Sequence, residues 1–322
     1  MKIFRSLAEL PPDFGPSAVT IGNFDGVHFG HRQILRRVTA VAAEHGWKPS
    51  VLTFDPHPTR VVAPNRTPPL LTSPQRRAAL MEEEGIAQVL ILPFTPELAL
   101  LTPEEFVRRL LVDAVGARAV LVGDNFRFGH KAAGNVRVLA ELGVKLGFTT
   151  EVVPAISCRG RVVSSSGIRE LIRAGSVSLA ARFLQHAYGV EGEVVSGRGV
   201  GSKQTVPTLN LATAAEVIPA SGVYVTRTRD LDNAREWRSI TNVGYRPTFG
   251  ASDQLTIETF LLDPLEGDTP ARIRVEFLRR VRAERKFDTP EHLRAQILKD
   301  VHAAQNYFRR AKAWTGRECI SC

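Results

Sequence analysis

The sequence predicts an α/β protein in two parts: a doubly wound parallel sheet, then a small antiparallel β-barrel with a C-terminal helix. Between residues 18 and 175, short apolar runs alternate with helical periods, which is typical of a parallel sheet covered by helices. From residue 190 onward, short β-rich runs end at Gly, Pro, Asp or Asn, as in small barrels. The 322 residues are enough for two hydrophobic cores, and we place the domains at 1–186 and 187–322.

Four runs in the first half are apolar on both faces and therefore predict buried strands: Ala18–Gly22, Ser50–Phe54, Gln88–Leu92 and Ala119–Gly123. The periods between and after them predict helices near His31–Glu44, Ser73–Glu84, Pro103–Asp113 and Asn135–Lys145. Ligands of such sheets bind beyond the carboxyl ends of the strands, so the turns that follow the strands are the first place to look for a site.

The most informative stretch is residues 19–34, which predicts a strand, a tight turn and the start of a helix. His28 and His31 are three residues apart where this helix begins, so both can lie on one face. The glycines at 22, 26 and 30 let a ligand approach the backbone, and a helix N-terminus attracts phosphate. We interpret this stretch as a nucleotide site. Capping histidines are the plain alternative; zinc is less favoured because no cysteine lies nearby.

Other polar residues follow the strands of the first half. Asp55 and His57 come after the second strand, and Asp124, Asn125 and Arg127 come after the fourth. The segment Ser164–Ser166 can cap a helix that carries Arg169, which is a phosphate-binding arrangement. Taken singly, Asp55, Asp124 and Asn125 are explained equally well as turn residues, and the serine segment alone is better explained as a plain N-cap with a solvated arginine. Several polar turns at one edge of a sheet nevertheless favour a shared ligand.

The second half begins after a short capped helix at residues 175–188. Its expected strands are Val190–Val195, Thr208–Leu211, Val223–Thr228, Trp237–Val243, Leu255–Leu262 and Arg272–Leu278. A final helix from Pro290 to Arg310 has one apolar stripe, which we expect to pack across the barrel: Leu293, Ile297, Val301, Ala304 and Phe308.

Residues 196–211 carry the chemistry expected of the barrel. Gly197, Gly199 and Gly201, followed by Lys203, can surround phosphate oxygens with backbone N–H groups. Thr208 and Asn210 point to one side of a strand, and their side-chain oxygens suit Mg²⁺ beside a nucleotide. A flexible turn would explain the glycines but not the Pro-Thr-x-Asn sequence.

Composition sets the broad class. The chain has 42 Lys and Arg residues against 33 Asp and Glu, a formal charge of +9, but the arginines are scattered. This distribution suits phosphorylated substrates as well as nucleic acid, and we expect no nucleic-acid partner. No apolar run predicts a membrane span or a signal core, so we expect a cytoplasmic protein with no membrane partner, and a monomer or weak homo-oligomer. Cys319 and Cys322 could form a redox pair but are interpreted as tail residues.

The segment Gly-x-Phe-Asp-Gly-x-His-x-Gly-His resembles the signature of the nucleotidyltransferase superfamily in the variant used by bacterial bifunctional riboflavin kinase/FAD synthetases. Ser-Ser-Ser-Gly-Ile-Arg at 164–169 is similar to its second phosphate motif, with Ser166 in place of threonine. The Pro-Thr-x-Asn segment, the block from Asn242 and the block from Thr256 resemble the kinase half. The sequence departs from the family pattern at Thr205-Val206, Leu209 and Phe260. The departure at Thr205-Val206 falls in the segment that forms the flap of the kinase in the family.

The resemblance implies a Rossmann-like nucleotidyltransferase domain and a riboflavin kinase barrel. One ATP phosphorylates riboflavin to FMN, and a second ATP adenylylates FMN to FAD, with Mg²⁺ as the metal. It implies the following roles. The catalytic residues are Glu258, His28, His31 and Arg169; Gly22, Phe24, Gly30, Ser164, Ser165 and Ser166 bind ATP for adenylyl transfer; Asp55, His57 and Asn125 bind FMN; Gly197, Gly199, Gly201 and Lys203 bind ATP in the kinase; and Thr208 and Asn210 bind the metal.

Two other functions stay open at this point. A single-activity adenylyltransferase for another phosphate ester would need the first-half motifs but not Pro-Thr-x-Asn or Glu258. A nucleic-acid-binding protein would explain the charge but neither phosphate motif.

Overall fold

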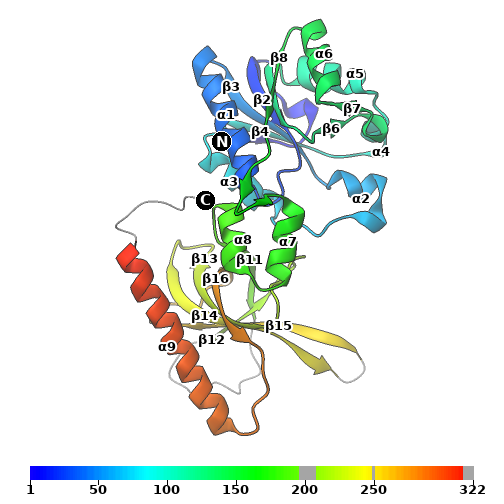
Figure 1. Ribbon diagram of the computed structural model, residues 1–322. Helices are drawn as coiled ribbons and strands as arrows, with labels where there is room; N and C mark the ends of the chain where they lie inside the picture. Colours follow the sequence, from blue (N-terminus) through cyan, green and yellow to red (C-terminus); the bar gives the residue numbers. More distant parts are fainter. Residues whose placement is uncertain (196–207, 249–250, 315–322) are drawn as a thin grey trace. The chain divides into compact units, whose positions relative to one another are not determined.

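The computed structural model describes residues 1–195, 208–248 and 251–314 (Figure 1). Contacts divide the chain into two compact units, residues 1–165 and 166–322, which are considered one at a time below. The predicted boundary between functional domains, at residues 186 and 187, stays a prediction.

The first unit is built on a six-stranded parallel sheet with the strand order β1-β4-β3-β2-β5-β8. The order reverses at β2, which has β3 on one side and β5 on the other. A crevice forms at such a reversal, so the turn that follows β2 lies where an open α/β sheet binds ligands. The strands are β1 (Lys2–Phe4), β2 (Ser17–Ile21), β3 (Lys48–Phe54), β4 (Gln88–Leu92), β5 (Ala117–Gly123) and β8 (Thr149–Val153).

Helices cover both faces of this sheet, as the alternating pattern predicted. One apolar core joins the sheet to α1 (Phe29–His45) and α3 (Pro74–Glu83). The other joins it to α5 (Pro103–Phe106), the π-helical segment η3 (Val107–Ala114) and α6 (Val136–Leu146). The four predicted strands and four predicted helices are confirmed. The smaller elements are η1 (Leu7–Glu9), α2 (Pro58–Val62), η2 (Pro64–Arg66), α4 (Pro96–Ala99), β6 (Arg127–Phe128), η4 (His130–Ala132), β7 (Gly134–Asn135), β9 (Ser157–Cys158) and β10 (Arg161–Val162).

The second unit contains a closed antiparallel barrel with the strand order β11-β12-β15-β14-β13-β16, which confirms the predicted six strands. Its strands are β11 (Tyr188–Val195), β12 (Thr208–Ala212), β13 (Gly222–Asp230), β14 (Glu236–Thr248), β15 (Ala251–Leu261) and β16 (Arg272–Ala283). Two helices precede it, α7 (Ser165–Arg173) and α8 (Val177–Leu184), and α8 packs on β11 and β16.

Part of the barrel interior is polar. The hydroxyl group of Thr226 contacts those of Ser239 at 2.8 Å and Thr241 at 2.7 Å, and Thr241 contacts Thr259 at 3.0 Å. All four side chains are fully buried. Because each hydroxyl can both donate and accept, these four residues satisfy one another's hydrogen-bonding groups without solvent. The row thereby fixes which residues of these strands face inward.

Helix α9 (Pro290–Trp314) packs on the outer face of β13, β14 and β16, as expected. Val301, Ala304 and Phe308 meet the apolar patch of the barrel. The prediction was wrong for the first two stripe positions, because Leu293 is 42% exposed and Ile297 is 40% exposed. Within the described residues, α9 contacts the apolar patch of the barrel through its later turns.

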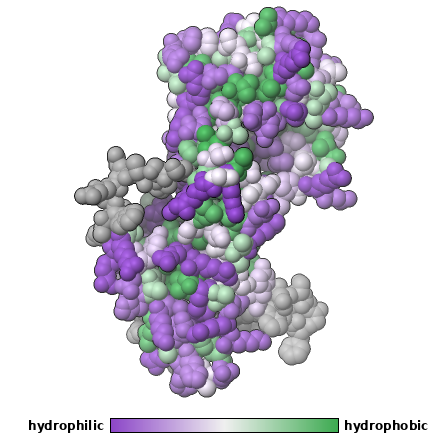
Figure 2. Space-filling view, in the orientation of Figure 1, coloured by the Kyte–Doolittle hydropathy of each residue, from purple (hydrophilic) through white to green (hydrophobic). Residues whose placement is uncertain are grey.

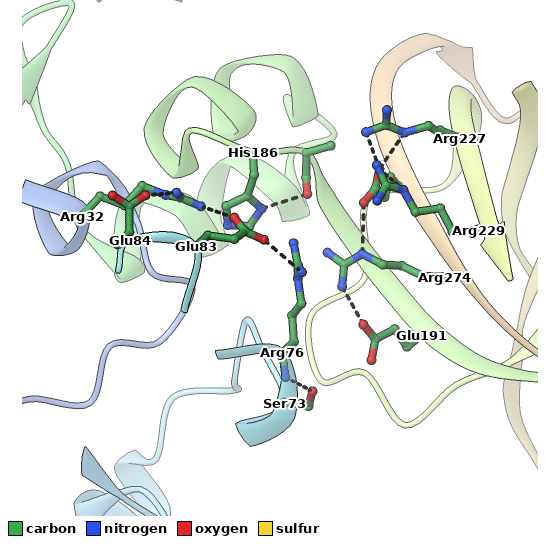
Figure 3. A network of polar contacts seen from close by, with 12 residues as sticks. Arg32, Ser73, Arg76, Glu83, Glu84, His186, Glu191, Arg227, Arg229 and Arg274 are labelled. Carbon is green, nitrogen blue, oxygen red and sulfur yellow. Dashed lines mark hydrogen bonds and ion pairs between the residues drawn. The ribbon is translucent and has the colours of Figure 1, made fainter. Parts of the chain in front are cut away.

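Hydrophilic residues cover much of the visible surface (Figure 2), and several arginines pair with carboxylates of their own unit. On the barrel, Arg274 pairs with Glu191 at 2.6 Å (Figure 3). Arg227 and Arg229 lie 2.7 Å and 3.5 Å from the carboxylate of Glu276. Burial alone would raise the pKa of Glu276, yet Arg227 and Arg274 hold it below its usual value. Part of the excess positive charge therefore lies in ion pairs within the barrel and is not available to a ligand.

Candidate active sites

The turn from β2 to α1 has an unusual backbone. Gly26 has φ 82°, as a glycine turn readily allows, but Phe24 and Val27 also have positive φ, at 50° and 40°. Such values strain a side chain with a Cβ atom, most of all the β-branched Val27. Both residues are buried, at 2% and 0% exposure, so packing holds the turn in this shape. Backbone strain of this kind is found mainly at ligand-binding segments.

The two predicted histidines lie together at the start of α1. His28 is the N-cap residue, and its Nδ1 accepts a hydrogen bond from the His31 N–H at 3.3 Å. The two rings stack with centroids 3.6 Å apart, and Phe24 meets His31 edge-on at 5.1 Å. A Cβ atom on Gly30 would lie 3.3 Å from the His28 ring, so glycine leaves room for it. The pair therefore stands at a helix N-terminus, where the first N–H groups have no partner within the helix backbone.

His31 is held neutral. Burial, and then the electrostatic effects of His28 and Arg77, lower the pKa of His31 well below its usual value. Its Nδ1 atom is buried and has no hydrogen-bond partner among the described residues. An anion beside the ring would favour a proton on it, so bound phosphate would reverse the effect of burial.

The Asp25 carboxylate holds the same turn in place through hydrogen bonds to the segment before α3. Asp25 is 3% exposed, and its carboxylate accepts hydrogen bonds from the Leu71 N–H at 2.9 Å, the Thr72 N–H at 3.1 Å and the Thr72 hydroxyl at 3.2 Å. The Gly26 N–H donates to the same Thr72 hydroxyl at 3.0 Å. The segment before α3 is thereby tied to the turn that carries the histidines.

His57 lies close to the turn, as predicted. The Asn23 side-chain amide is 2.9 Å from His57 Nε2, and the Asn23 carbonyl accepts a bond from Arg77 at 2.6 Å. Asp55 contributes to the field around the buried Arg77: burial lowers the pKa of Arg77, and Asp25 and Asp55 oppose that effect. Asn125 is exposed in the turn after β5, at the neighbouring strand end.

The serine motif joins the turn through one member. The Ser165 hydroxyl donates to the Asp25 carbonyl at 2.9 Å, and Ser164 is half-buried beside it in sequence. Ser166, which is exposed, and Arg169, which is 6% exposed, belong to the second unit. Their predicted convergence on the same phosphate stays a prediction.

The residues predicted for the kinase lie on the outer face of the barrel. Asn210 of β12 pairs directly with Glu258 of β15, and Thr208 pairs with Phe260. Paired residues of an antiparallel ladder point to the same face, so Thr208, Asn210 and Glu258 share one surface. Thr208 is exposed and the other two are half-buried. The predicted phosphate residues Gly197, Gly199, Gly201 and Lys203, and the departure at Thr205-Val206, lie outside the described residues.

This donor set can be tested against the metal. The described residues contain no group of three or more His, Cys, Asp and Glu side chains that could hold an ion. The barrel face instead offers the Thr208 hydroxyl and the Asn210 amide oxygen, which are hard oxygen donors of the kind that Mg²⁺ takes together with substrate phosphates and water. The residues therefore fit Mg²⁺ and do not fit a zinc site.

Comparison with known proteins gives the family. A family model for FAD synthetase matches residues 11–167, and one for riboflavin kinase matches residues 184–308. A bifunctional riboflavin kinase/FMN adenylyltransferase of Pseudomonas fluorescens is 36% identical to this chain, and the match covers 95% of this chain and 97% of the relative. The chain belongs to this bifunctional family. The relative of the same name in Escherichia coli K12 is 31% identical, and the match covers 97% of this chain and 99% of the relative.

The bifunctional family's fold also appears in the crystal structure of a protein named a macrolide-efflux protein, from Streptococcus pneumoniae. It has a TM-score of 0.83 and 25% identity, and the match covers 94% of this chain and 98% of that one. That name describes a different role from the one that the two family models indicate. Within the described residues of this chain, no helix has the length and apolar character needed to cross a membrane.

Sequence reasoning gave no role to three residues of the first unit, namely Asn23, Asp25 and Arg77, although Asp25 is part of the quoted Gly-x-Phe-Asp-Gly segment. The available signal was polar and acidic side chains inside a turn otherwise made of Gly, Phe and Val, since buried charges are rare unless paired. Their partners, 34 and more residues away along the chain, could not be identified from spacing.

Proposed function

We propose that this member of the bifunctional family carries out its two reactions with residues on two different scaffolds. The riboflavin kinase reaction transfers the γ-phosphoryl group of ATP to riboflavin and gives FMN and ADP. The FMN adenylyltransferase reaction transfers the adenylyl group of a second ATP to FMN and gives FAD and pyrophosphate. The stacked His28–His31 pair at the N-terminus of α1 is the observation that carries the proposal for adenylyl transfer.

In adenylyl transfer, a phosphate oxygen of FMN attacks the α-phosphorus of ATP, and the bond to pyrophosphate breaks. The nucleophile is already an anion, so the site needs no base; it needs alignment and stabilisation of the charge that develops on pyrophosphate. His28, His31 and the α1 N–H groups supply donors, while Gly22, Phe24 and Gly30 shape the seat. Ser164, Ser165, Ser166 and Arg169 complete it, and Asp55, His57 and Asn125 hold FMN.

In the kinase, a neutral ribityl hydroxyl is the nucleophile. Glu258 takes its proton while the oxygen attacks the γ-phosphorus and the bond to ADP breaks. Thr208 and Asn210 hold Mg²⁺, which offsets negative charge on the phosphates when it is bound. The direct pairing of Asn210 with Glu258 supports a base beside the metal ligands. Gly197, Gly199, Gly201 and Lys203 are proposed to surround the nucleotide.

The remaining assignments are also proposals. Both reactions consume ATP, which supports a cytoplasmic location. The paired arginines on both units support small phosphorylated substrates over nucleic acid as partners. A monomer or weak homo-oligomer stays a prediction.

The test is incubation of the protein with riboflavin, ATP and Mg²⁺, with flavins separated by chromatography. We expect FMN first and then FAD, and neither product when the metal is chelated. FAD from supplied FMN without any FMN from riboflavin would support a single-activity adenylyltransferase. Salt-sensitive binding of an oligonucleotide, with no flavin product, would support a nucleic-acid-binding protein.

A further inference from the structure

Two buried arginines of the first unit differ in their partners. Arg32 on α1 is 6% exposed, and Arg77 on α3 is 3% exposed. Arg32 is paired, since it bonds the carboxylate of Glu84 and lies 3.4 Å from that of Glu83. Among the described residues Arg77 forms no ion pair, and its side chain has one hydrogen bond, which Nη1 donates to the Asn23 carbonyl at 2.6 Å.

A buried guanidinium with one hydrogen bond is incompletely satisfied. The group carries a full charge and five N–H donors, and the Asn23 carbonyl uses one of them. Burying a charge is costly unless it is paired, so a buried arginine normally has a carboxylate, as Arg32 has. Burial lowers the pKa of Arg77, and Asp25 and Asp55 oppose that effect, but neither forms an ion pair with it among the described residues. The guanidinium therefore has charge and donors left for an anion.

Arg77 lies between the residues proposed to bind ATP and those proposed to bind FMN. After burial, which is the main cause, Arg77 also lowers the pKa of His31, so its charge acts at the start of α1. Its bond to the Asn23 carbonyl places it at the turn after β2, and the Asn23 amide is 2.9 Å from His57 Nε2. Asp55 follows β3, the neighbour of β2 in the parallel sheet, so both turns leave the same edge of the sheet.

A second buried polar atom lies at the same turn. The His31 Nδ1 atom has no hydrogen-bond partner among the described residues. The first N–H groups of α1, beside this ring, have no partner within the helix backbone. Phosphate oxygens can accept hydrogen bonds from a guanidinium, from a ring N–H and from a helix N-terminus, so one kind of ligand would satisfy all three.

We propose that Arg77 is a further catalytic residue of the FMN adenylyltransferase reaction, and that its guanidinium binds the phosphate groups of FMN and ATP at the point where they react. This inference rests on the proposed function of the first unit. An oxygen of the FMN phosphate forms a bond to the α-phosphorus of ATP while the bond from that phosphorus to pyrophosphate breaks, and Arg77 keeps its protons throughout. Both reacting groups are anions, so a cation between them offsets their repulsion as they approach. Arginine suits this role because its planar fork of donors can bond two phosphate oxygens at once.

The test compares Arg77→Gln and Arg77→Lys with the wild type, with the same two substitutions of Arg32 as matched controls. FAD formation is followed with FMN and ATP varied separately, and FMN formation from riboflavin reports on the second unit. For Arg77→Gln we expect kcat/KM for FAD formation to fall by about a hundredfold or more. For Arg77→Lys, which keeps the charge but loses the fork, we expect a loss of about tenfold. Arg32→Lys should keep the wild-type constants, because a lysine there can still pair with Glu84.

Stability separates phosphate binding from a purely structural role. Arg32→Gln removes a buried partner of Glu84, so it should lower the thermal unfolding midpoint while the folded enzyme stays active. Arg77→Gln removes no ion pair among the described residues, so its midpoint without ligands should fall less although it is the less active variant. A higher KM for FMN alone would assign the contact to the FMN phosphate, and a higher KM for ATP alone would assign it to the α-phosphate of ATP; either result supports the proposal.

Wild-type kinetic constants in both Arg77 variants would overturn the proposal, as would an equal loss of FAD formation in Arg32→Lys. A midpoint for Arg77→Gln as low as that of Arg32→Gln, together with wild-type constants for Arg77→Lys, would show a structural role only. If Arg77→Gln does not fold, the constants of Arg77→Lys decide. A wild type that makes no FAD from supplied FMN would instead refute the proposed function, whereas an active wild type with normal Arg77 variants would refute this inference alone.

Discussion

Replacing Asp25 with asparagine should loosen the turn that carries the histidines. The buried carboxylate accepts three donors, the Leu71 N–H, the Thr72 N–H and the Thr72 hydroxyl. A hydrogen bond to a charged group contributes about 1 kcal/mol more than one to a neutral group, so the substitution should cost roughly 3 kcal/mol. The new amide nitrogen would also face the Leu71 N–H, which now lies 3.0 Å from the second carboxylate oxygen.

The assay is thermal inactivation of FAD synthesis from supplied FMN, which follows the first unit. A loss of roughly 3 kcal/mol corresponds to a decrease of about 6–12 °C in midpoint for a unit of this size. The control is Asp13→Asn: Asp13 is 81% exposed beside Lys48, so it should leave the midpoint unchanged. A midpoint for Asp25→Asn equal to that of the control would refute the reasoning, because the carboxylate would then not hold the turn.

Three further outcomes follow from the geometry. Because burial lowers the pKa of His31, the unfolded chain binds a proton that the folded chain does not once the pH falls below about 6.5. Stability should then fall by up to about 1.4 kcal/mol per pH unit, and His31→Gln should flatten this dependence in denaturant titrations. Gly192→Ala should destabilise the barrel by about 3 kcal/mol or more, since its Cβ would lie 1.9 Å from the Ala212 carbonyl oxygen. Gly46→Ala, whose Cβ would meet nothing within 4 Å, should cost only the strain of φ 68°, about 1 kcal/mol. Equal losses of stability in these two variants, each relative to the wild type, would contradict the predicted clash of a Cβ at position 192 with the Ala212 carbonyl oxygen.

The sequence carried enough pattern to predict the central strands but not the edges of the sheet. Strand β4 was predicted with its observed bounds, Gln88–Leu92, because it is buried on both faces and reads as one apolar run. Strand β1 was missed because it has only three residues. Strand β8 was missed because it contains Thr149, Thr150 and Glu151, since an edge strand needs apolar residues on fewer sides.

Periodicity also could not show how far a partner surface extends. Three of the five predicted stripe residues of α9 meet the barrel, but Leu293 and Ile297 remain exposed, because a helix period says nothing about the width of the barrel beneath it. The histidine pair was predictable because three-residue spacing and the helix start depend on neighbours in sequence. The roles of Asp25 and Arg77 depend on contacts between distant segments, so they required the structure.

The central claim is that the two reactions use separate residues on separate scaffolds, and the most direct measurement follows both half-reactions in two variants. For His31→Ala we predict FAD formation from FMN lower by about a hundredfold or more, with FMN formation from riboflavin retained. For Glu258→Gln we predict the reverse: no FMN from riboflavin, and normal FAD from supplied FMN. Loss of both reactions in either folded variant would contradict the claim.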